Sequence, residues 1–471
     1  MLTYSFDNLA GESMYIHLYK CIKNDIASGV LKQGNKLPSK RTLAKNLGIS
    51  LITVENAYAQ LMVEGYIFSR PKRGYYVSAI QSTLQGVKAE DYTINTAITK
   101  KEAYFADFVR SSVPPDTFPY NIWARLLRYT LSSVDQHDLM GDTSAGGVWP
   151  LRQALAKHLY QFRGMNVAPE QIVIGAGTQS LYNLVVQLLG RNHIYALEDP
   201  GYPQLAQVYS YNDVFCRFLP MDEQGVQPDV LESSNADILH ITPSHQFPTG
   251  ILMPISRRYE LLSWASAKSS RYIIEDDYDC EFRLYGKPIP PLQSIDNDEK
   301  VIYINTFSKT LAPTFRISYM LLPPHLASMF YHKLGFYSCT VSNFEQFTLA
   351  KFIEEGHLER HINRMRTYYK NKRNEILKYI DNSPFKAALQ VKCEDGGLHF
   401  LLQLNTSASD SELKAAAKAH GINIKFLSEY YHYQTNDSSH TLLMNYSGLS
   451  DDVLYPALDR LFKALAPYLH R

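Results

Sequence analysis

The sequence lacks long apolar runs: none of its 471 residues falls in an uninterrupted apolar stretch of about 18. Its start, MLTYSFDNLAGESMY, has neither the basic residues nor the apolar core of a secretory signal peptide. Five scattered cysteines never show C-x-x-C spacing, which argues against a disulfide framework and against a zinc site. We therefore expect a cytoplasmic protein that has reduced cysteines, no metal site and no part in the membrane.

Positive charge is concentrated at the front of the chain, although the formal net charge is only +1. Residues 1 to 78 hold seven lysines and three arginines against two aspartates and three glutamates. This excess of five positive charges leaves the remaining residues at a net charge of −4. A compact basic segment joined to a larger acidic body is typical of a module that binds a polyanion.

The first 78 residues predict three helices followed by a hairpin. Apolar residues recur at helical spacing in the first and third helices: Tyr15, Leu18, Ile22 and Ile26, then Val54, Ala57, Tyr58 and Leu61. Between them, SKRTLAKNL forms a short helix that ends at Gly48, and Ser50 caps the third helix. GYIFSRPKRGYYVS then gives two short strands around a cationic turn. This order is typical of a winged helix-turn-helix.

Such a module approaches DNA with its second and third helices and its hairpin turn. Three groups of residues are our candidates for contact with double-stranded operator DNA: Lys40 and Arg41 for phosphates, Ser50, Thr53 and Glu55 for base edges, and Lys72 and Arg73 for the backbone or the minor groove. The alternative is a solvated basic face. DNA contact predicts an affinity that falls steeply with salt.

The rest of the chain predicts a linker and a large α/β domain. Residues 79–103 are polar without periodicity, so we assign domains to residues 1–78 and 104–471 with this linker between them. Five apolar runs alternate with long helical stretches: QIVIGAG, HIYALEDP, DILHITPS, RYIIEDDY and VIYINTFS. This alternation indicates a mostly parallel sheet, in which ligands bind at the carboxyl ends of the strands.

Several of these strand ends carry residues with a chemical use. GAGTQ opens a helix whose amides near Thr178 and Gln179 suit a phosphate, although a glycine pair alone more often marks a tight turn. Tyr202 follows the next strand and suits the face of a flat ring, although a surface tyrosine is the simpler interpretation of that motif alone. In IIEDDYD, adjacent acids at a strand end need a cation nearby, unless the segment is a solvated loop.

Lys309 completes the set. A lysine after a buried strand has a depressed pKa and is nucleophilic toward an aldehyde. Thr306, Ser308 and Arg316 add hydroxyl and guanidinium donors for a phosphate. Phosphate donors, a stacking ring, a carboxylate for a ring nitrogen and a Schiff-base lysine are together what pyridoxal 5'-phosphate requires. The joint pattern is much more specific than any one member.

These motifs resemble a known family. LPSKRTLAKNLGIS, TVENAYAQLMVEGYI and RGYYV, within residues 12 to 78, are similar to the winged helix of the GntR family of bacterial regulators. From about residue 104 onward, GTQ, EDPGYP, PSHQFPTG, EDDYD and SKT resemble a fold-type I aminotransferase-like domain, with a small C-terminal α+β subdomain. Their fusion in this order resembles the MocR subfamily, over nearly the whole chain.

The resemblance implies a function for each motif residue: Lys309 as the Schiff-base lysine, Asp276 opposite the pyridine nitrogen, Tyr278 on the phenolic oxygen, Tyr202 over the ring, and Thr178, Gln179, Thr306 and Arg316 around the phosphate. It also implies a head-to-tail homodimer.

The chain departs from the family pattern at three places. Leu443, in LMNYSGL, stands where related enzymes have an arginine that holds the substrate α-carboxylate. Phe247 replaces the asparagine of an NPTG motif, and His245 or Gln246 is the candidate to compensate. Pro203 and the glutamine after it stand where a related regulator has an arginine that helps to bind its amino-acid effector.

We expect a transcription regulator whose aminotransferase-like domain senses an amino acid or amine through pyridoxal phosphate. The alternative is a working aminotransferase with a DNA-binding appendage. Leu443 argues against this alternative, because fast transamination needs the substrate carboxylate to be held in a fixed orientation and leucine cannot hold it. The half-reaction that gives pyridoxamine phosphate stays an open alternative, since Lys309 can still move a proton. A third hypothesis makes pyridoxal phosphate itself the signal, for control of vitamin B6 synthesis. Lys425, in INIKFLS, is a candidate partner for an effector carboxylate.

Overall fold

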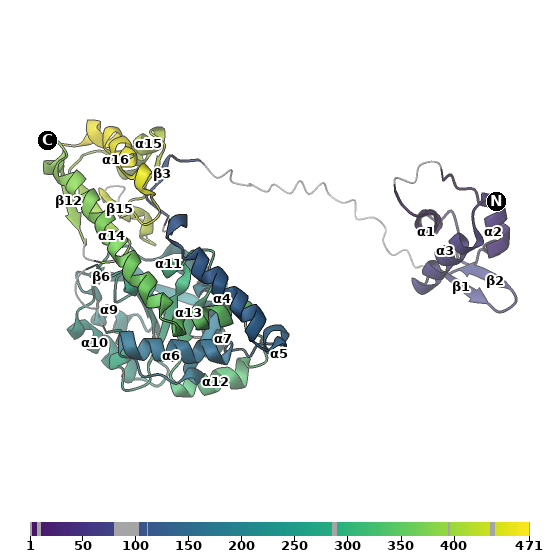
Figure 1. The fold of residues 1–471 in the computed structure, drawn as a ribbon, viewed down its shortest axis with the longest axis horizontal. Coiled ribbons are helices and arrows are strands. Elements are labelled where there is room, and N and C mark those ends of the chain that lie inside the picture. The colour runs from purple at the N-terminus through teal and green to yellow at the C-terminus, as the bar shows by residue number, and fades with distance from the viewer. Residues whose placement is uncertain are drawn as a thin grey trace. The chain divides into compact units, whose positions relative to one another are not determined.

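The computed structural model describes residues 2–6, 11–79, 103–110, 112–284, 290–393, 396–433 and 439–470. The chain divides into two compact units, Met1–Lys100 and Lys101–Arg471, drawn in Figure 1. Of the predicted linker, all but residues 79 and 103 lie outside the described residues. The predicted domain boundaries remain predictions.

The N-terminal unit has the predicted order of elements: α1 (Met14–Ala27), α2 (Lys40–Leu47), α3 (Leu51–Val63), β1 (Ile67–Arg70) and β2 (Gly74–Val77). Side-chain caps begin two of its helices. The hydroxyl of Ser39 accepts the Thr42 N–H at 3.1 Å, and that of Ser50 accepts the Thr53 N–H at 3.1 Å. β1 and β2 pair antiparallel as the wing. Each cap satisfies a free N–H of the first turn, so both helix starts are set by local sequence.

One hydrophobic core holds this unit together, and it includes Leu18 and Ile22 of α1 and Val54, Tyr58 and Leu61 of α3. The two predicted apolar faces are therefore confirmed, with one exception. Tyr15 was predicted on the apolar face of the first helix, but it lies outside the core and is 38% exposed. Its position at the start of α1, ahead of the residues that α3 covers, leaves it at the edge of the contact.

An eight-stranded sheet forms the centre of the C-terminal unit, in the order β4-β11-β10-β9-β8-β5-β6-β7. Its strands are β4 (Ile172–Gly175), β5 (Ile194–Asp199), β6 (Phe215–Asp222), β7 (Gly225–Val226), β8 (Ile238–Ile241), β9 (Tyr272–Asp276), β10 (Val301–Thr306) and β11 (Ser318–Leu321). The neighbours from β10 to β6 pair in parallel, as the alternation of apolar runs predicted. β11 was not predicted, and it pairs antiparallel with both β10 and β4.

Helices cover this sheet, as Figure 1 shows. They are α4 (Tyr120–Ser133), α5 (Gln136–Met140), α6 (Trp149–Arg163), α7 (Thr178–Leu189), α8 (Pro203–Ser210), α9 (Pro228–Ser233), α10 (Ile255–Ser266), α12 (Pro324–Leu334) and α13 (Asn343–Glu354). Every residue of β9 except Tyr272 and every residue of β10 is buried. Parallel strands covered on both faces read as continuous apolar runs, which is why the sequence showed them clearly.

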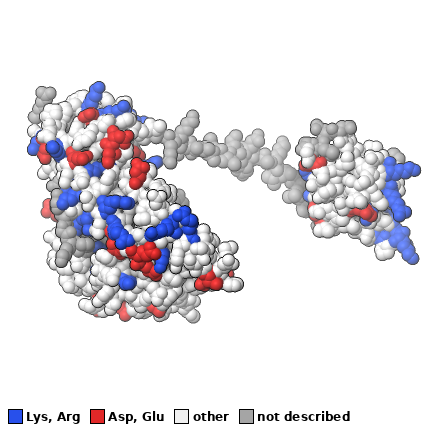
Figure 2. All heavy atoms as spheres, in the orientation of Figure 1, with Lys and Arg blue, Asp and Glu red and all other residues white. Residues whose placement is uncertain are grey.

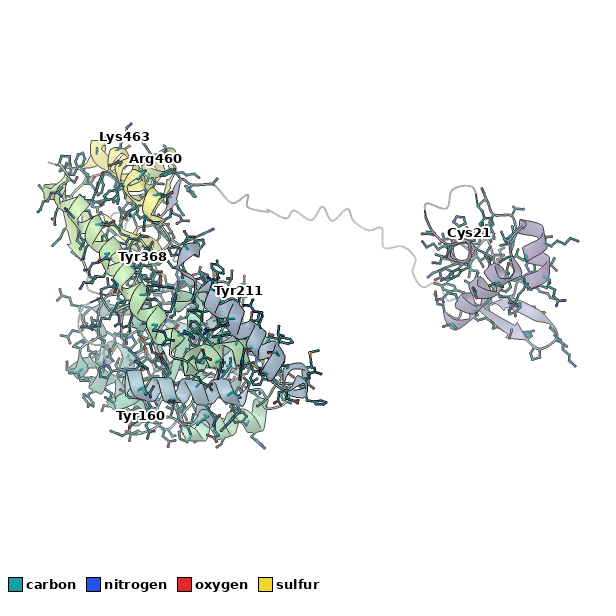
Figure 3. All side chains as sticks on the ribbon, viewed as in Figure 1. Cys21, Tyr160, Tyr211, Tyr368, Arg460 and Lys463 are labelled. Carbon is teal, nitrogen blue, oxygen red and sulfur yellow. The ribbon has the colours of Figure 1, made fainter. Side chains whose placement is uncertain are left out.

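A smaller subdomain follows, built on the sheet β12-β13-β15 and on a second pair, β14 with β3. Its elements are α14 (His357–Asp381), β12 (Leu389–Lys392), β13 (His399–Leu404), α15 (Asp410–Ala419), β14 (Ile422–Asn423), β15 (Thr441–Asn445) and α16 (Asp451–Leu465), with β3 (Ala106–Asp107) from the start of the unit. Figure 3 labels Tyr368 on α14, whose hydroxyl donates to Asp451 of α16 at 2.9 Å. Among the described residues, no helix is both long and apolar enough to cross a membrane.

Candidate functional site

The predicted site residues follow the carboxyl ends of strands in the central sheet. Asp276 ends β9, and Lys309 lies in α11 (Phe307–Thr310), directly after β10. These two strands are parallel neighbours in which Asp276 pairs with Ile304, so the two residues leave the sheet at the same edge. Tyr202 precedes α8 just after β5, and Thr178 begins α7 just after β4. The fold therefore gathers side chains that are far apart in the sequence.

Lys309 is half-buried, and its surroundings favour the neutral amine. Burial lowers the pKa of its ammonium below the usual value for lysine. The carboxylates of Asp279 and Asp276 act in the opposite direction and offset part of this effect. A larger fraction of the amine is therefore free to act as a nucleophile at neutral pH than for an exposed lysine.

Asp276 has one oxygen in use and one without a partner. Its Oδ2 accepts the hydroxyl of Tyr182 and lies 3.7 Å from Nε2 of His240. Its Oδ1 is buried and has no hydrogen-bond partner among the described residues. A buried carboxylate oxygen without a donor is costly. A flat ring that carries a protonated nitrogen fits this position.

The proposed phosphate side is shaped by Gly177 and Arg316. Gly177 has a φ of 85°, and a Cβ built on it would lie 2.2 Å from Nη2 of Arg316. The guanidinium therefore occupies the space that any other residue would fill with its side chain. It stands at the N-terminus of α7, whose first backbone N–H groups lack helical partners. Amides and guanidinium together suit a phosphate.

The side chains of two residues that were predicted to bind the phosphate lie in other surroundings as well. The hydroxyl of Thr306 accepts the N–H of Ser308 at 3.1 Å and the hydroxyl of Ser318 at 2.8 Å, so it caps the start of α11. Gln179 is exposed, and its side chain lines a separate surface cavity along α7 and α8. For Gln179, only the backbone amide is placed to serve a phosphate.

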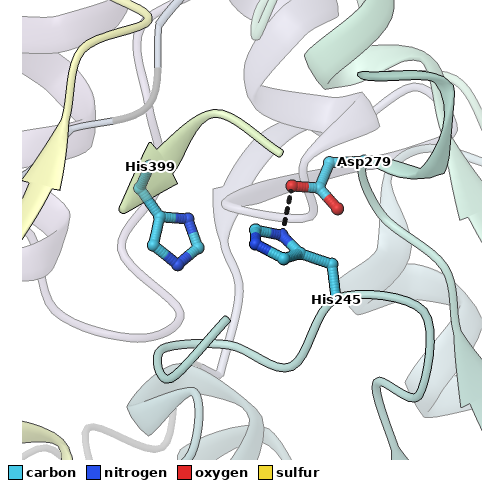
Figure 4. Close-up of side chains that lie close together, drawn as sticks. All are labelled: His245, Asp279 and His399. Carbon is cyan, nitrogen blue, oxygen red and sulfur yellow. Dashed lines mark hydrogen bonds and ion pairs between the residues drawn. The ribbon is translucent and has the colours of Figure 1, made fainter. Parts of the chain in front are cut away.

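Figure 4 shows a cluster that the sequence did not predict, formed by His245, Asp279 and His399. Nδ1 of His245 lies 2.9 Å from Oδ2 of Asp279 and 3.2 Å from the hydroxyl oxygen of Tyr278. His399 donates from Nε2 to the carbonyl of Pro248 at 3.1 Å. His245 therefore connects Tyr278 to a buried carboxylate and restricts the orientation of the tyrosine hydroxyl.

The three residues of this cluster are buried, with one donor atom from each lying within 4.8 Å of the others. Burial, with the neighbouring ring of His245, lowers the pKa of His399 well below its usual value, so this imidazole is neutral. Gly397 has a φ of 70°, and a Cβ there would come within 2.1 Å of His245. Asp279 adjoins Tyr278 in the EDDYD motif and could have been found from it, whereas His399 carried no such signal.

The other acids of EDDYD have partners of their own. Asp277 pairs with Arg163 and accepts the hydroxyl of Tyr303 at 2.9 Å, so the cation predicted beside this motif is confirmed. Glu275 accepts the backbone N–H groups of Leu292 at 2.7 Å and of the residue after it at 2.9 Å. Burial nevertheless raises the pKa of Glu275 to about 7. Neither acid faces a solvated loop, the alternative interpretation of this segment.

An apolar cluster occupies the surroundings of Leu443. The side chain is fully buried against Leu401 and Tyr430, with Phe247 packed on the same group. Phe247 also meets Tyr202 edge to face, with ring centroids 5.8 Å apart. The amide of Gln246 donates to the carbonyl of Phe247 at 2.8 Å, to that of Pro200 at 3.0 Å and to a carboxylate oxygen of Glu198 at 3.3 Å. Its assignment to the place of the missing asparagine stays a prediction.

Lys425 lies next to this cluster. Its ammonium is 4.0 Å from the ring centroid of Tyr430, a cation–π contact. Burial lowers the pKa of Lys425, and the carboxylate of Glu429 offsets part of that effect. The assignment of Lys425 to an effector carboxylate remains a prediction.

The N-terminal unit has a basic edge. In Figure 2, lysines and arginines line the edge that carries α2 and the β1–β2 hairpin. Arg41, Lys72 and Arg73 are exposed. The ammonium of Lys40, by contrast, lies 3.5 Å from a carboxylate oxygen of Glu55. A phosphate would have to compete with this ion pair, so we expect Lys40 to contribute less than the wing.

The hydroxyls of Ser50 and Thr53, predicted to meet base edges, lie 2.8 Å apart in a mutual hydrogen bond. That bond belongs to the cap of α3 and leaves both residues at the start of this helix. Neither side chain is buried. Both remain available for a second hydrogen bond outward.

Comparisons with known proteins match both units. Residues 14–77 match the family described as bacterial regulatory proteins, gntR family, and residues 128–461 match aminotransferase class I and II. The chain is similar to the kynurenine aminotransferase of Pyrococcus horikoshii, solved with PMP, with a TM-score of 0.68 at 24% identity over 83% of this chain and 97% of that one. At this identity the likeness concerns the fold.

Curated relatives extend over both units. The "Uncharacterized HTH-type transcriptional regulator YhdI" of Bacillus subtilis (strain 168) is 37% identical over 99% of both chains. The "Probable rhizopine catabolism regulatory protein MocR" of Rhizobium meliloti is 29% identical over 97% of this chain and 95% of its own. The "HTH-type pyridoxine biosynthesis transcriptional regulator PdxR" of Corynebacterium glutamicum is 30% identical over 89% of both.

These matches define the class: a GntR-type winged helix-turn-helix joined to a fold-type I aminotransferase domain. The chain belongs to the HTH-type transcriptional regulators that carry this fusion, and within them to the MocR subfamily. The predicted fold class and the predicted family are confirmed.

Proposed function

We propose that this MocR-type regulator binds operator DNA through its N-terminal unit and pyridoxal 5'-phosphate at Lys309 of its C-terminal unit, where a small-molecule signal is sensed. The observation that carries the cofactor assignment is the unpartnered buried oxygen of Asp276, which leaves the sheet at the same edge as Lys309. When bound, pyridoxal phosphate supplies an aldehyde carbon that combines with amines.

Different residues of this chain bind different parts of the cofactor. Asp276 accepts from the ring nitrogen, and Tyr202 covers one face of the ring. Tyr278, held by His245, donates to the phenolic oxygen. Arg316 binds the phosphate, together with the amides of residues 178 and 179 and the hydroxyl of Thr306. Lys309 provides the amine, and its lowered pKa increases the fraction of this amine that is unprotonated and able to take up a proton.

The surroundings of Leu443 favour a regulator over an aminotransferase. Rapid transamination needs the substrate carboxylate to be held in one orientation. Leu401, Tyr430 and Phe247 pack around Leu443, and the ammonium beside this group, that of Lys425, lies on the ring of Tyr430 and cannot bind a carboxylate through two parallel hydrogen bonds as an arginine does. Ligand occupancy at Lys309 would then bias the C-terminal unit between conformations, and the regulator would respond through its DNA affinity.

On the DNA side, Arg41, Lys72 and Arg73 contact phosphates or the minor groove, and Lys40 contributes less. Ser50 and Thr53 face base edges from the start of α3. A head-to-tail homodimer would present two such modules and require paired half-sites. The exposed basic edge of the N-terminal unit supports this assignment.

The test is a titration of cofactor-stripped, full-length protein against the DNA upstream of its own gene, with and without pyridoxal phosphate. Specific binding that changes with the cofactor would make the cofactor itself a signal and would direct the search for target genes to vitamin B6 synthesis, the process in the name of one relative. Specific binding that does not change would make it a fixed prosthetic group and direct attention to amines and amino acids. Absence of specific DNA binding, or of cofactor binding, would contradict the proposal.

A further inference from the structure

A cavity of about 530 Å³ lies beside the proposed cofactor residues. It shares Asp276 and Tyr202 with them and extends along α8 and β6 to residues 429–432. This volume falls within the range of about 300–1,000 Å³ that is usual for small-molecule sites. None of the residues placed around the phosphate lines it, so part of it is available to a second molecule.

The charges on the wall of this cavity are of one sign. Four of its lining residues are acids, Glu198, Asp199, Asp276 and Glu429, and none of the described lining residues is a lysine or an arginine. Asp199 accepts the backbone N–H of His432 at 2.8 Å. Glu429 accepts from the ammonium of a lysine of α15 and from the backbone N–H of a neighbouring phenylalanine.

Glu198 is different, because one of its oxygens has no partner. Oε2 accepts both the N–H and the hydroxyl of Thr242, at 3.1 and 2.8 Å, and the amide of Gln246 at 3.3 Å. Oε1 is buried and has no hydrogen-bond partner among the described residues. The residue is only 8% exposed, and it lines the cavity. Burial raises the pKa of Glu198 to about 7, so a positive charge beside Oε1 would favour the ionised carboxylate. A ligand with a hydrogen-bond donor, and best with a positive charge, then satisfies this oxygen.

Aromatic rings complete the wall. Tyr202, Phe247 and Tyr430 line the cavity, and the ring of Phe247 lies edge to face with Tyr430 at 5.3 Å between centroids. Such rings accept an apolar body and attract a cation at their faces. Leu443 packs behind Phe247 and Tyr430, so no arginine holds an acidic group here, and such a group would face the four acids of the wall. The ammonium beside this wall is that of Lys425, 4.0 Å from the ring centroid of Tyr430, and burial lowers its pKa, which makes it a weaker countercharge than an arginine.

We infer that the signal sensed by this protein is an amine that carries no carboxylate beside its amino group, with Glu198 accepting from its cationic end and Tyr202, Phe247 and Tyr430 enclosing its apolar part. The inference rests on the proposed function. It names the chemical class of the effector and sets aside α-amino acids.

Matched ligand pairs test it on full-length protein loaded with pyridoxal phosphate. Each pair is an amino acid and the amine that remains when its carboxylate is removed: lysine and cadaverine, tyrosine and tyramine, phenylalanine and phenethylamine. Affinities come from calorimetry, with the visible spectrum recorded in parallel. In at least one pair the amine should bind about tenfold tighter or more, because desolvating an unpaired carboxylate is costly. Equal or tighter binding by the amino acid in every pair would overturn the inference.

Two variants, each with a matched control, test which residues make the amine bind more tightly than the amino acid. Glu198→Gln should weaken the amine by about tenfold, as expected when a hydrogen bond between charged groups is lost, whereas Glu429→Gln, whose oxygens both have partners, should change it little. Leu443→Arg should shift the ratio of the two affinities toward the amino acid, whereas Leu443→Met should not. An effect of Glu198→Gln no larger than that of Glu429→Gln would refute the role of Glu198.

The outcomes separate this inference from the proposed function. If no ligand of any pair binds while the protein still holds its cofactor and its DNA, the effector is not an amine and the inference fails alone. If the cofactor or the DNA is not bound, the proposed function fails first. Circular dichroism and thermal unfolding test whether Leu443→Arg is folded. If it is not folded, the ligand pairs measured on the wild-type protein decide whether amines are preferred to amino acids.

Discussion

Gly177 offers a sharp test of the phosphate side of the site, through the substitution Gly177→Ala. Its Cβ would lie 2.2 Å from Nη2 and 2.6 Å from Cζ of Arg316, so the guanidinium must move away from the N-terminus of α7. A hydrogen bond between charged groups contributes about 1.5–3 kcal/mol, which corresponds to roughly 10- to 100-fold in affinity. We therefore expect pyridoxal phosphate to bind Gly177→Ala about 10- to 100-fold more weakly.

Gly190 provides the matched control, because it has nearly the same backbone conformation. Gly177 has φ 85° and ψ 162°, and Gly190 has φ 109° and ψ 158°, both in a region that only glycine adopts easily. A Cβ on Gly190 would meet only His193, at an ordinary 3.8 Å. Both alanine variants should therefore lose a similar stability, of the order of 1–3 kcal/mol, but only Gly177→Ala should lose cofactor affinity.

The assay is a pyridoxal phosphate titration of stripped protein followed by visible absorbance, with thermal unfolding of the same samples. Arg316→Ala should weaken binding to a similar extent, and the double variant should be little worse than either single one, since both changes remove one interaction. Binding by Gly177→Ala within about twofold of wild type would refute this account of the phosphate side. An equal loss in Gly190→Ala would assign the effect to backbone strain instead.

Three further predictions concern the lysine and the DNA face. Lys309→Ala should lose the visible absorbance that the cofactor acquires on reacting with a lysine, while DNA binding is retained; persistence of that band would disprove the assignment. Because burial lowers the pKa of Lys309 and Asp279 raises it, the rate of cofactor capture against pH should reach its plateau below 10.5, and Asp279→Asn should move the plateau to lower pH; an unchanged or upward shift would contradict this. Arg73→Ala should reduce the slope of log affinity against log salt by about 0.9, and Lys40→Ala by less, because Lys40 pairs with Glu55; equal reductions would show that this ion pair does not hold on DNA.

Local features of the molecule were predictable from sequence because each depends on neighbouring residues. Ser39 and Ser50 cap their helices through amides three positions away, and the wing follows from its turn residues. The buried parallel strands showed as continuous apolar runs, and the order of motifs indicated the family. The antiparallel strand β11 was missed: it pairs with β10, which lies close to it in the chain, and with β4, which lies far from it and shows no local signal of this pairing.

The tertiary structure alone decided which of these groups meet. It brings Tyr182 and His240, from a helix and another strand, to one oxygen of Asp276 and leaves the other without a partner. It joins His245 to Asp279 across 34 positions in the sequence, and it pairs Lys40 with Glu55. Sequence by itself determined the local elements and the kind of residue at each strand end, because caps, turns and apolar runs act over a few residues. Which polar atoms find partners was decided by the packing of distant segments, since a buried group is satisfied only by what the fold places beside it.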